Sequence, residues 1–184
     1  MLTFKFAPLI AIPTMVISYF LAALAYKQIR GSRIYEVMFS MPMAIASAPA
    51  AAIWWALLSP NQSGIINHLL GKDIRWLLDE RYAIYAVAFV TVWIAIGTNF
   101  IFLLTGFRNV PEELLESAKI DGSGYFRTLF KIMTPIASPQ IFFVLFFNIT
   151  TSFQAFAQIR LMTEGGPSYS TNVLVYSIYQ SAIR

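Results

Sequence analysis

The residues with the most evident chemistry form a charged segment between two long apolar runs. Its centre reads Glu116-Ser117-Ala118-Lys119-Ile120-Asp121-Gly122. Pro111 is suited to open a helix, because its missing N–H would have no partner in the first turn in any case. The Asp121–Gly122 pair is suited to end that helix, because glycine accepts a positive φ without a steric clash. The segment therefore predicts a short helix that ends in a tight turn.

A second short helix is expected directly after this turn, with Asp121 or Ser123 as its N-cap. Its apolar residues recur at helical spacing, which predicts that they share one side of the helix. They are Phe126, Leu129, Phe130 and Met133. Pro135 and Pro139 mark the entry to the next apolar run. On its own, this pattern is also compatible with an ordinary loop between two membrane helices.

The spacing Glu-x-Ala-x-x-Asp-Gly, followed by Phe-x-Ile-x-x-Pro-x-x-x-Pro, resembles the signature of permease subunits of binding-protein-dependent ABC importers. The matching positions are Glu116, Ala118, Asp121, Gly122, Phe130, Ile132, Pro135 and Pro139. The small residue after the glutamate is usually alanine in that family and is Ser117 here. The resemblance implies that residues 109–134 form a cytoplasmic coupling-helix loop and that these eight residues couple the chain to an ATPase.

Other segments are similar to the sugar and glycerol-3-phosphate permeases of the same superfamily. They are Arg30–Arg33, Met41–Pro42, Ser152–Phe156, Met162–Pro167 and Thr171–Leu174. The resemblance implies an all-α, polytopic transmembrane helix bundle, the permease core of a type I ABC importer. Residues 1–184 are expected to form a single permease domain that is shorter than the family at both ends.

The same resemblance implies several partners for the chain. They are an ABC ATPase dimer, a second homologous permease subunit, an extracytoplasmic solute-binding protein and the membrane lipid. ATP hydrolysis would belong to the partner, since the chain has no Gly-x-x-x-x-Gly-Lys-Ser/Thr loop. No cofactor and no nucleic acid are expected, and the imported solute would be a sugar or glycerol-3-phosphate.

The composition independently favours a protein of the cell membrane. Hydrophobic residues make up 58% of the chain and charged residues only 12%, against about a quarter charged in soluble domains. The chain has no cysteine, which excludes disulfides and thiolate chemistry. The net charge of +4 is spread over short loops, so it indicates topology and not a surface for nucleic acid.

Four apolar runs are long enough to cross a bilayer, and a fifth begins near the end of the chain. The expected spans are Ala7–Tyr26, Val37–Leu58, Tyr82–Thr105 and Pro135–Ala157, with Thr171–Arg184 as the approach to a further helix. Pro42 and Pro49 lie inside the second run and predict kinks within one span. Ile65–Leu70 is expected to be a short helix on the membrane surface.

The distribution of basic residues predicts the orientation of these spans. Lys27, Arg30 and Arg33 follow the first run, and Arg108, Lys119, Arg127 and Lys131 flank the charged segment. Both segments are therefore expected on the cytoplasmic side. The opposite segments mix Lys72, Arg75, Arg81 and Arg160 with Asp73, Asp79, Glu80 and Glu164.

Two other classes of function were considered. An ion-coupled secondary transporter commonly carries ionisable relay groups within its spans, and the four expected runs contain none. A membrane-embedded enzyme would need a base, a nucleophile or a metal set. The acids and the single histidine, His68, lie in loops, so neither catalytic residues nor a metal site are predicted.

Polar residues inside the expected spans are the candidates for a solute path. Asn148 and Ser152 are four residues apart and share a helix face, with Thr151 beside them. Asn99 could face them from the third span. The alternative, given equal weight, is that these groups only form hydrogen bonds between helices.

Overall fold

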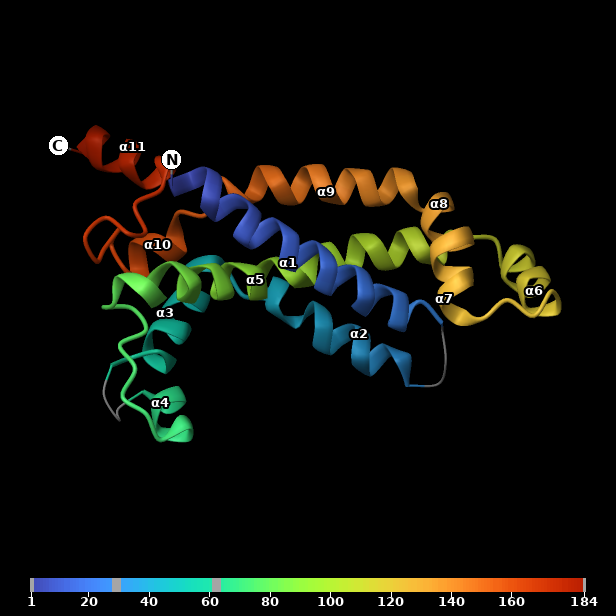
Figure 1. Ribbon diagram of the computed structural model, residues 1–184, viewed down its shortest axis with the longest axis horizontal. Helices are drawn as coiled ribbons and strands as arrows, with labels where there is room; N and C mark the ends of the chain where they lie inside the picture. Colours follow the sequence, from blue (N-terminus) through green and yellow to red (C-terminus); the bar gives the residue numbers. More distant parts are fainter. Residues whose placement is uncertain (1, 28–30, 61–63, 184) are drawn as a thin grey trace. The chain divides into compact units, whose positions relative to one another are not determined.

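The computed structural model describes residues 2–27, 31–60 and 64–183, which form helices and no strand (Figure 1). Contacts divide the chain into two compact units. Unit 1 comprises Met1–Pro13, Ala44–Ile94 and Ile149–Arg184, and unit 2 comprises Thr14–Met43 and Ala95–Asn148. Three of the α-helices, α1 (Leu2–Ala25), α5 (Glu80–Arg108) and α9 (Ser138–Ser152), contribute to both units.

The membrane-spanning character predicted from the sequence is confirmed. Within the described residues, α1, α5 and the stretch Ser138–Met162 are each long and apolar enough to cross a membrane. A pair of helices separated by a short break provides a fourth candidate. The expected first and third spans correspond to α1 and α5, and each helix extends beyond the predicted run.

The second run, expected over Val37–Leu58 with kinks at its prolines, is divided between two helices that are bent by 96° at the break. Helix α2 covers Ser32–Ser40, a 3₁₀ turn η1 covers Met41–Ala44, and α3 begins only at Ser47 and ends at Leu57. Ala46 is extended, with φ −61° and ψ 149°, so the helix is interrupted and not merely kinked. Pro42 lies in the 3₁₀ turn and Pro49 in the first turn of α3, where a missing N–H removes no helical hydrogen bond.

The fourth run also departs from its predicted bounds of Pro135–Ala157. It is divided into α8 (Thr134–Ile136) and α9 (Ser138–Ser152), and the short helix α10 covers Ala157–Met162. Residues 153–156 between α9 and α10 form no helix. The final helix α11 covers Leu174–Ile183, as the sequence predicted for the approach to a further helix.

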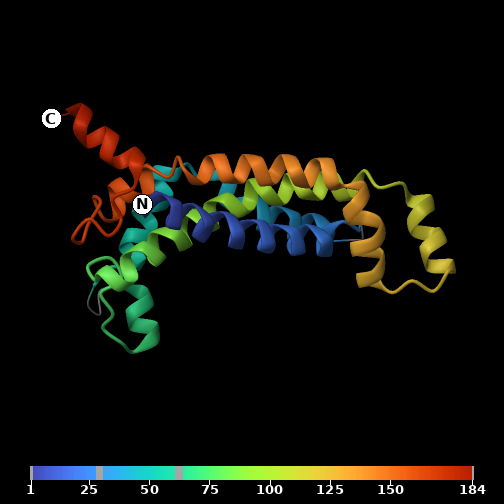
Figure 2. The same ribbon diagram turned by 45° about the horizontal axis from the view of Figure 1, so that its top comes forward.

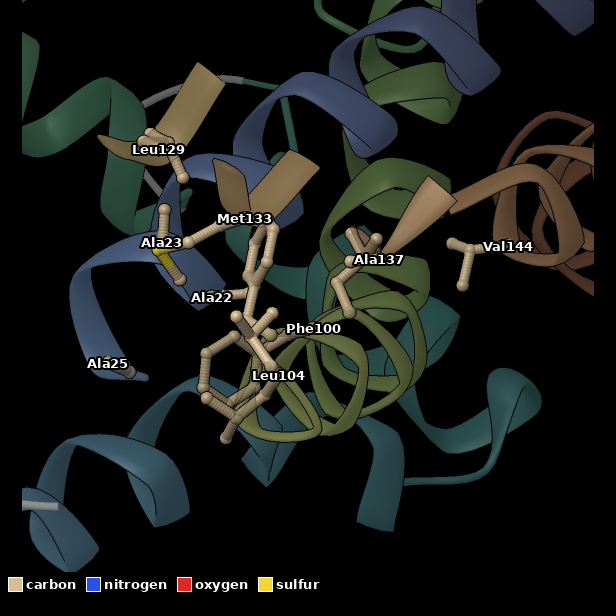
Figure 3. Close-up of a cluster of buried hydrophobic side chains, with 12 residues drawn as sticks. Ala22, Ala23, Ala25, Phe100, Leu104, Leu129, Met133, Ala137 and Val144 are labelled. Carbon is tan, nitrogen blue, oxygen red and sulfur yellow. The ribbon is translucent and has the colours of Figure 1, made fainter. Parts of the chain in front are cut away.

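Unit 2 is organised around a core of apolar side chains from α1, α5, the π-helical segment η2 (Leu129–Met133) and the α8–α9 region (Figure 3). Alanines on α1 allow larger side chains from the other elements to pack closely. The fully buried members are Ala22, Ala23, Phe100, Leu103, Phe107, Leu129, Met133 and Val144.

Two glycines of α5 permit close approach of other helices in unit 2. A Cβ atom on Gly97 would lie 2.9 Å from the backbone N of Met43 and 3.1 Å from the carbonyl oxygen of Ser40. A Cβ atom on Gly106 would lie 2.8 Å from Cγ of Gln140 on α9. Gly106 follows the expected third run, Tyr82–Thr105, but it lies inside α5. Small residues at such contacts are typical of helix packing in membranes.

In unit 1, aromatic rings join α3 to the first half of α5. The ring of Trp54 packs edge-on against Phe89 at 5.1 Å and against Trp93 at 5.6 Å. Helix α3 also packs against α10. The backbone N–H of Leu174 donates to Oγ1 of Thr3 at 2.9 Å, which joins the start of α11 to the start of α1. Among the small residues of 44–52, only Ala50 and Ala51 are buried.

The predicted short helix at Ile65–Leu70 is present as α4. It ends at Gly71, whose φ is +60°. Trp76 Nε1 donates to Oδ1 of Asn67 at 2.8 Å, and Asn67 Nδ2 donates to the carbonyl of Ile74 at 2.9 Å. These bonds fold the following loop back onto α4. His68 is exposed, and the described residues contain no cluster of three potential metal ligands.

Candidate functional site

The charged segment folds as the sequence predicted, into two short helices around a turn. Helix α6 covers Glu112–Ile120 and α7 covers Tyr125–Thr128. In both views α6 lies beyond α7, away from the long helices of unit 2 (Figure 2). Pro111 is the N-cap of α6, one position earlier than its expected place, and Glu112 and Glu113 occupy the first turn. Acidic residues there interact favourably with the helix dipole.

The turn after α6 is a Schellman motif centred on Gly122. The N–H of Gly122 donates to the carbonyl of Lys119 at 3.0 Å, and the N–H of Ser123 donates to the carbonyl of Ala118 at 2.8 Å. Gly122 has φ +71°, a conformation that favours glycine. A Cβ atom on Gly122 would meet no heavy atom within 4 Å. Glycine is therefore favoured at this position because of the positive φ. The surrounding atoms would leave room for a side chain.

The outer surface of α6 and its turn is both charged and apolar. Glu116, Asp121 and Gly122 are exposed, and Ile120 is 87% exposed. Ala118 is buried, and Leu115 packs against the core of unit 2. The helix thus has a narrow attached side and a broad exposed side. An isoleucine exposed to this degree beside two carboxylates is suited to contact with another protein.

The second helix differs from its prediction in two respects. Its N-cap is Gly124, without a side-chain hydrogen bond, so neither Asp121 nor Ser123 caps it. The four apolar residues expected on one side are divided between two sides. Leu129 and Met133 are fully buried, whereas Phe126 is 67% exposed and Phe130 is 52% exposed.

The physical reason is that α7 continues into the π-helical segment η2. Leu129 and Met133 share the buried side of this wider turn, whereas Phe130 falls on its exposed side. The N–H and the hydroxyl of Thr134 both donate to the carbonyl of Leu129, the hydroxyl at 2.8 Å. Pro135 has no N–H to bond the carbonyl of Lys131, which removes an α-helical hydrogen bond at this point. Such π-turns are frequent at functional sites.

Two tyrosines attach this segment to the end of α1. Tyr125 on α7 donates its hydroxyl to the carbonyl of Ala23 at 2.6 Å. The hydroxyl of Tyr19 on α1 is hydrogen-bonded to Oγ1 of Thr134. The Tyr19 ring packs edge-on against Phe107 at 5.3 Å and stacks on Phe130 at 6.3 Å. Burial raises the pKa of the Tyr125 hydroxyl, so this group remains a hydrogen-bond donor at neutral pH.

Removing one of these hydroxyls should loosen the attachment measurably. We expect Tyr125→Phe to cost about 1 kcal/mol, the usual net value of one hydrogen bond, and so to raise local opening about fivefold. Hydrogen–deuterium exchange over residues 123–134 would measure this change. Tyr85→Phe is the matched control, because Tyr85 is 60% exposed on α5. Equal exchange in both variants would contradict the attachment through Tyr125.

An ion pair that the sequence analysis missed joins α2 to α5. Arg108 donates through both terminal nitrogens to the carboxylate of Glu36, with Nη1 at 3.2 Å from Oε2. The same guanidinium reaches the carbonyls of Ala25 and Tyr26 at 3.4 Å. Glu36 lay just outside the expected second span, and α2 includes it. The sequence draws attention to Glu36 in one way only: it is the first acidic residue of the chain.

The eight motif residues do not form one surface. Glu116, Asp121 and Gly122 are exposed on α6 and its turn, while Ala118 faces inward. The other four motif residues lie in the segment that leads through η2 into α8 and α9. Phe130 is exposed and stacks on Tyr19, Ile132 is half-buried, and Pro135 and Pro139 are exposed near the starts of α8 and α9. The first group could contact a partner, and the second shapes the connection to α1 and α9.

The predicted path residues belong to different units. Asn99 and Asn148 are buried in unit 2, and the Nδ2 atom of Asn99 has no hydrogen-bond partner among the described residues. Thr151 and Ser152 belong to unit 1, where Ser152 Oγ donates to the carbonyl of Ile149 at 2.7 Å. Their assembly into one site therefore stays a prediction. Arg30, part of one matching segment and of the predicted topology, lies outside the described residues.

Comparison with known proteins gives one consistent result. The chain matches the family "Binding-protein-dependent transport system inner membrane component" over residues 9–183. It is 37% identical to the sn-glycerol-3-phosphate transport system permease protein UgpA of Escherichia coli O157:H7, over 97% of this chain and 61% of that protein. The UgpA of Salmonella typhimurium is 36% identical over the same shares. The chain thus spans about three fifths of the length of these relatives.

The fold is also found among solved structures. A bacterial ABC transporter involved in the import of the acidic polysaccharide alginate matches with a TM-score of 0.89 and 20% identity, over 99% of this chain and 66% of that one. The alginate transporter in complex with a pentasaccharide-bound periplasmic protein matches equally, over 65% of its chain. These likenesses confirm the all-α membrane fold. The family match over residues 9–183 identifies this multi-pass membrane protein as a member of the binding-protein-dependent transport system inner membrane components.

Proposed function

We propose that this chain forms the permease of an ATP-driven importer and that α6, with its Gly122 turn, docks on a separate ATPase subunit. The observation that carries the proposal is the geometry of α6. Its exposed side presents Glu116, Asp121 and Ile120, while its inner side and the following segment are fixed to unit 2. A helix exposed on one side and anchored on the other is suited to receive force from a partner.

The anchoring contacts support transmission of that force into the membrane. Leu129 and Met133 are fully buried in the core of unit 2. Tyr19 and Tyr125 attach the same segment to α1 through two hydrogen bonds. Movement of α6 would therefore reach α1 and α9 as a rigid-body displacement, because packed cores shift between discrete arrangements and do not deform continuously.

The remaining partners follow from family membership and stay proposals for this chain. A second homologous permease subunit would complete the membrane pathway, and an extracytoplasmic binding protein would deliver the solute. The alginate importer, which is also solved in complex with a pentasaccharide-bound periplasmic protein, supports this arrangement. On this proposal the α6 side faces the cytoplasm, and the 164–170 loop faces outside.

The imported solute is proposed to be a sugar or glycerol-3-phosphate. The relatives named as sn-glycerol-3-phosphate permeases support the phosphorylated solute. Asn99, Asn148, Thr151 and Ser152 remain the proposed path residues. Asn99 is the strongest candidate among them, because its buried Nδ2 is a hydrogen-bond donor that a solute could satisfy.

The family is a permease component and not a catalytic one. We infer further that this chain binds no nucleotide and that hydrolysis belongs wholly to the ATPase subunit. The complete transporter, reconstituted in proteoliposomes, tests the proposal. Uptake should require ATP on the α6 side and the binding protein on the other. Uptake driven by an ion gradient in the absence of ATP would instead support a secondary transporter.

A further inference from the structure

A polar cavity in unit 2 has no role in the proposed coupling. It has a volume of about 510 Å³ and lies where the ends of α1 and α5 meet α6. Its lining consists of Tyr26, Lys27, Phe107, Arg108, Val110, Glu112, Leu115 and Lys119. This volume falls in the usual range for small-molecule sites.

The cavity is predominantly basic, with three basic residues and one acid, Glu112, in its lining. Arg108 is bound to the carboxylate of Glu36 and to the carbonyls at the end of α1, so its side chain is held in place on one side of the cavity. Lys27 and Lys119 make no ion pair with any described residue. Two lysines therefore remain available to an anion that enters the cavity.

A second, apolar cavity adjoins the same lysine. It has a volume of about 290 Å³ and is lined by residues of α1, by Lys27 and by residues of α2. The lining residues are Leu24, Ala25, Lys27, Ser32, Tyr35 and Phe39. Lys27 thus borders a polar cavity and an apolar one, which is the arrangement that an amphiphile with an anionic head requires.

We propose that these two cavities bind one anionic phospholipid, with its phosphate between Lys27 and Lys119 and part of an acyl chain against Leu24 and Phe39. The site lies at the charged ends of two membrane-spanning helices, α1 and α5. Basic pockets between helices at this level of a membrane recognise lipid headgroups. The apolar cavity favours a lipid over a soluble phosphate compound, because the latter would leave that cavity unfilled.

Bound lipid would rest against Leu115 and Lys119 of α6 and against the end of α1. It would therefore contact both the docking helix and the span to which the docking segment is attached. The lipid site does not depend on the identity of the imported solute, and its occupancy can be measured without transport.

The experiment is native mass spectrometry of the complete transporter from nanodiscs that contain phosphatidylcholine with a minority of phosphatidylglycerol. We expect phosphatidylglycerol to remain bound to the wild type. Loss of both cationic contacts in Lys27→Gln/Lys119→Gln should weaken its binding roughly 30-fold. Lys27→Arg/Lys119→Arg should retain it, because the charge is preserved.

Lys72→Gln/Lys131→Gln is the matched control, since it removes the same charge from lysines that line neither cavity. Equal retention of phosphatidylglycerol by both glutamine variants would overturn the proposal. A second arm adds excess inorganic phosphate to the lipid-depleted transporter. One outcome would show a site for a soluble anion and contradict the lipid proposal. In that outcome the wild type retains no lipid but binds phosphate, and Lys27→Gln/Lys119→Gln loses the phosphate.

Discussion

Replacing Gly122 with valine should abolish ATP-coupled uptake while leaving the chain in the membrane. Gly122 has φ +71°, and a β-branched residue in this region costs on the order of 1–3 kcal/mol. No atom of the chain lies within 4 Å of the added Cβ. The damage should therefore be confined to the Schellman turn and to whatever contacts it. The measurement is uptake by the complete transporter, normalised to membrane level and to the amount of retained ATPase.

Three controls separate the docking role from general strain. Gly124→Val adds the same side chain two residues away, where φ is −70° and space is open, and should have little effect. Gly71→Val strains an equivalent turn after α4, with φ +60°, and should not uncouple uptake. Gly122→Asn tests the backbone angle, because asparagine tolerates positive φ. Wild-type uptake by Gly122→Val would show that this glycine is an ordinary turn residue.

Replacing Gly97 with valine should instead reduce the stability of unit 2. The added Cβ would lie 2.9 Å from the backbone N of Met43 and 3.1 Å from the carbonyl of Ser40. Backbone atoms cannot rotate away, so η1 would have to separate from α5. Overpacking of this kind costs about 1–3 kcal/mol or more. The expected result is a lower membrane level and a lower melting temperature in detergent.

Gly106→Ala provides the comparison within the same helix. Its Cβ would lie 2.8 Å from Cγ and 2.9 Å from Cβ of Gln140, and Gln140→Ala would remove only the first of these two atoms. We expect Gly106→Ala to be milder than Gly97→Val, because its contacts are side-chain atoms, and to be rescued only in part by Gln140→Ala. A wild-type melting temperature for Gly97→Val would contradict the close approach of η1 to α5.

Several elements could be predicted because local chemistry determines them. The apolar runs defined α1 and α5, since few other structures satisfy the backbone in lipid. Asp121–Gly122 defined the turn after α6, because few residues accept the φ of +71° observed there. The family resemblance carried by the eight motif residues was confirmed by the match over residues 9–183.

Other elements depended on contacts that a sequence does not display. The second run reads as continuously apolar, but η1 packs against Gly97, and the helix is interrupted at that point. The π-turn at Leu129–Met133 divided residues that α-helical spacing had placed together. Tyr19 joins α1 to Thr134, a partner 115 residues away, and no local pattern indicates that pair.

The coupling role of individual motif residues stays a prediction, although their placement explains the pattern in part. Glu116 and Asp121 are exposed, as docking residues must be. Ala118 is buried and small, which allows α6 to lie against the rest of unit 2. Pro135 lies two residues after the end of η2, where its missing N–H favours the wider turn.

The most direct test is site-specific photocrosslinking of the complete transporter at Ile120, which is 87% exposed on α6. Leu69 is the matched position, because it is 78% exposed on α4. A photoreactive residue at Ile120 should crosslink to the ATPase subunit, and one at Leu69 should not. Crosslinks from Leu69 to the ATPase, or from Ile120 only to the binding protein, would contradict the docking of α6 on the ATPase.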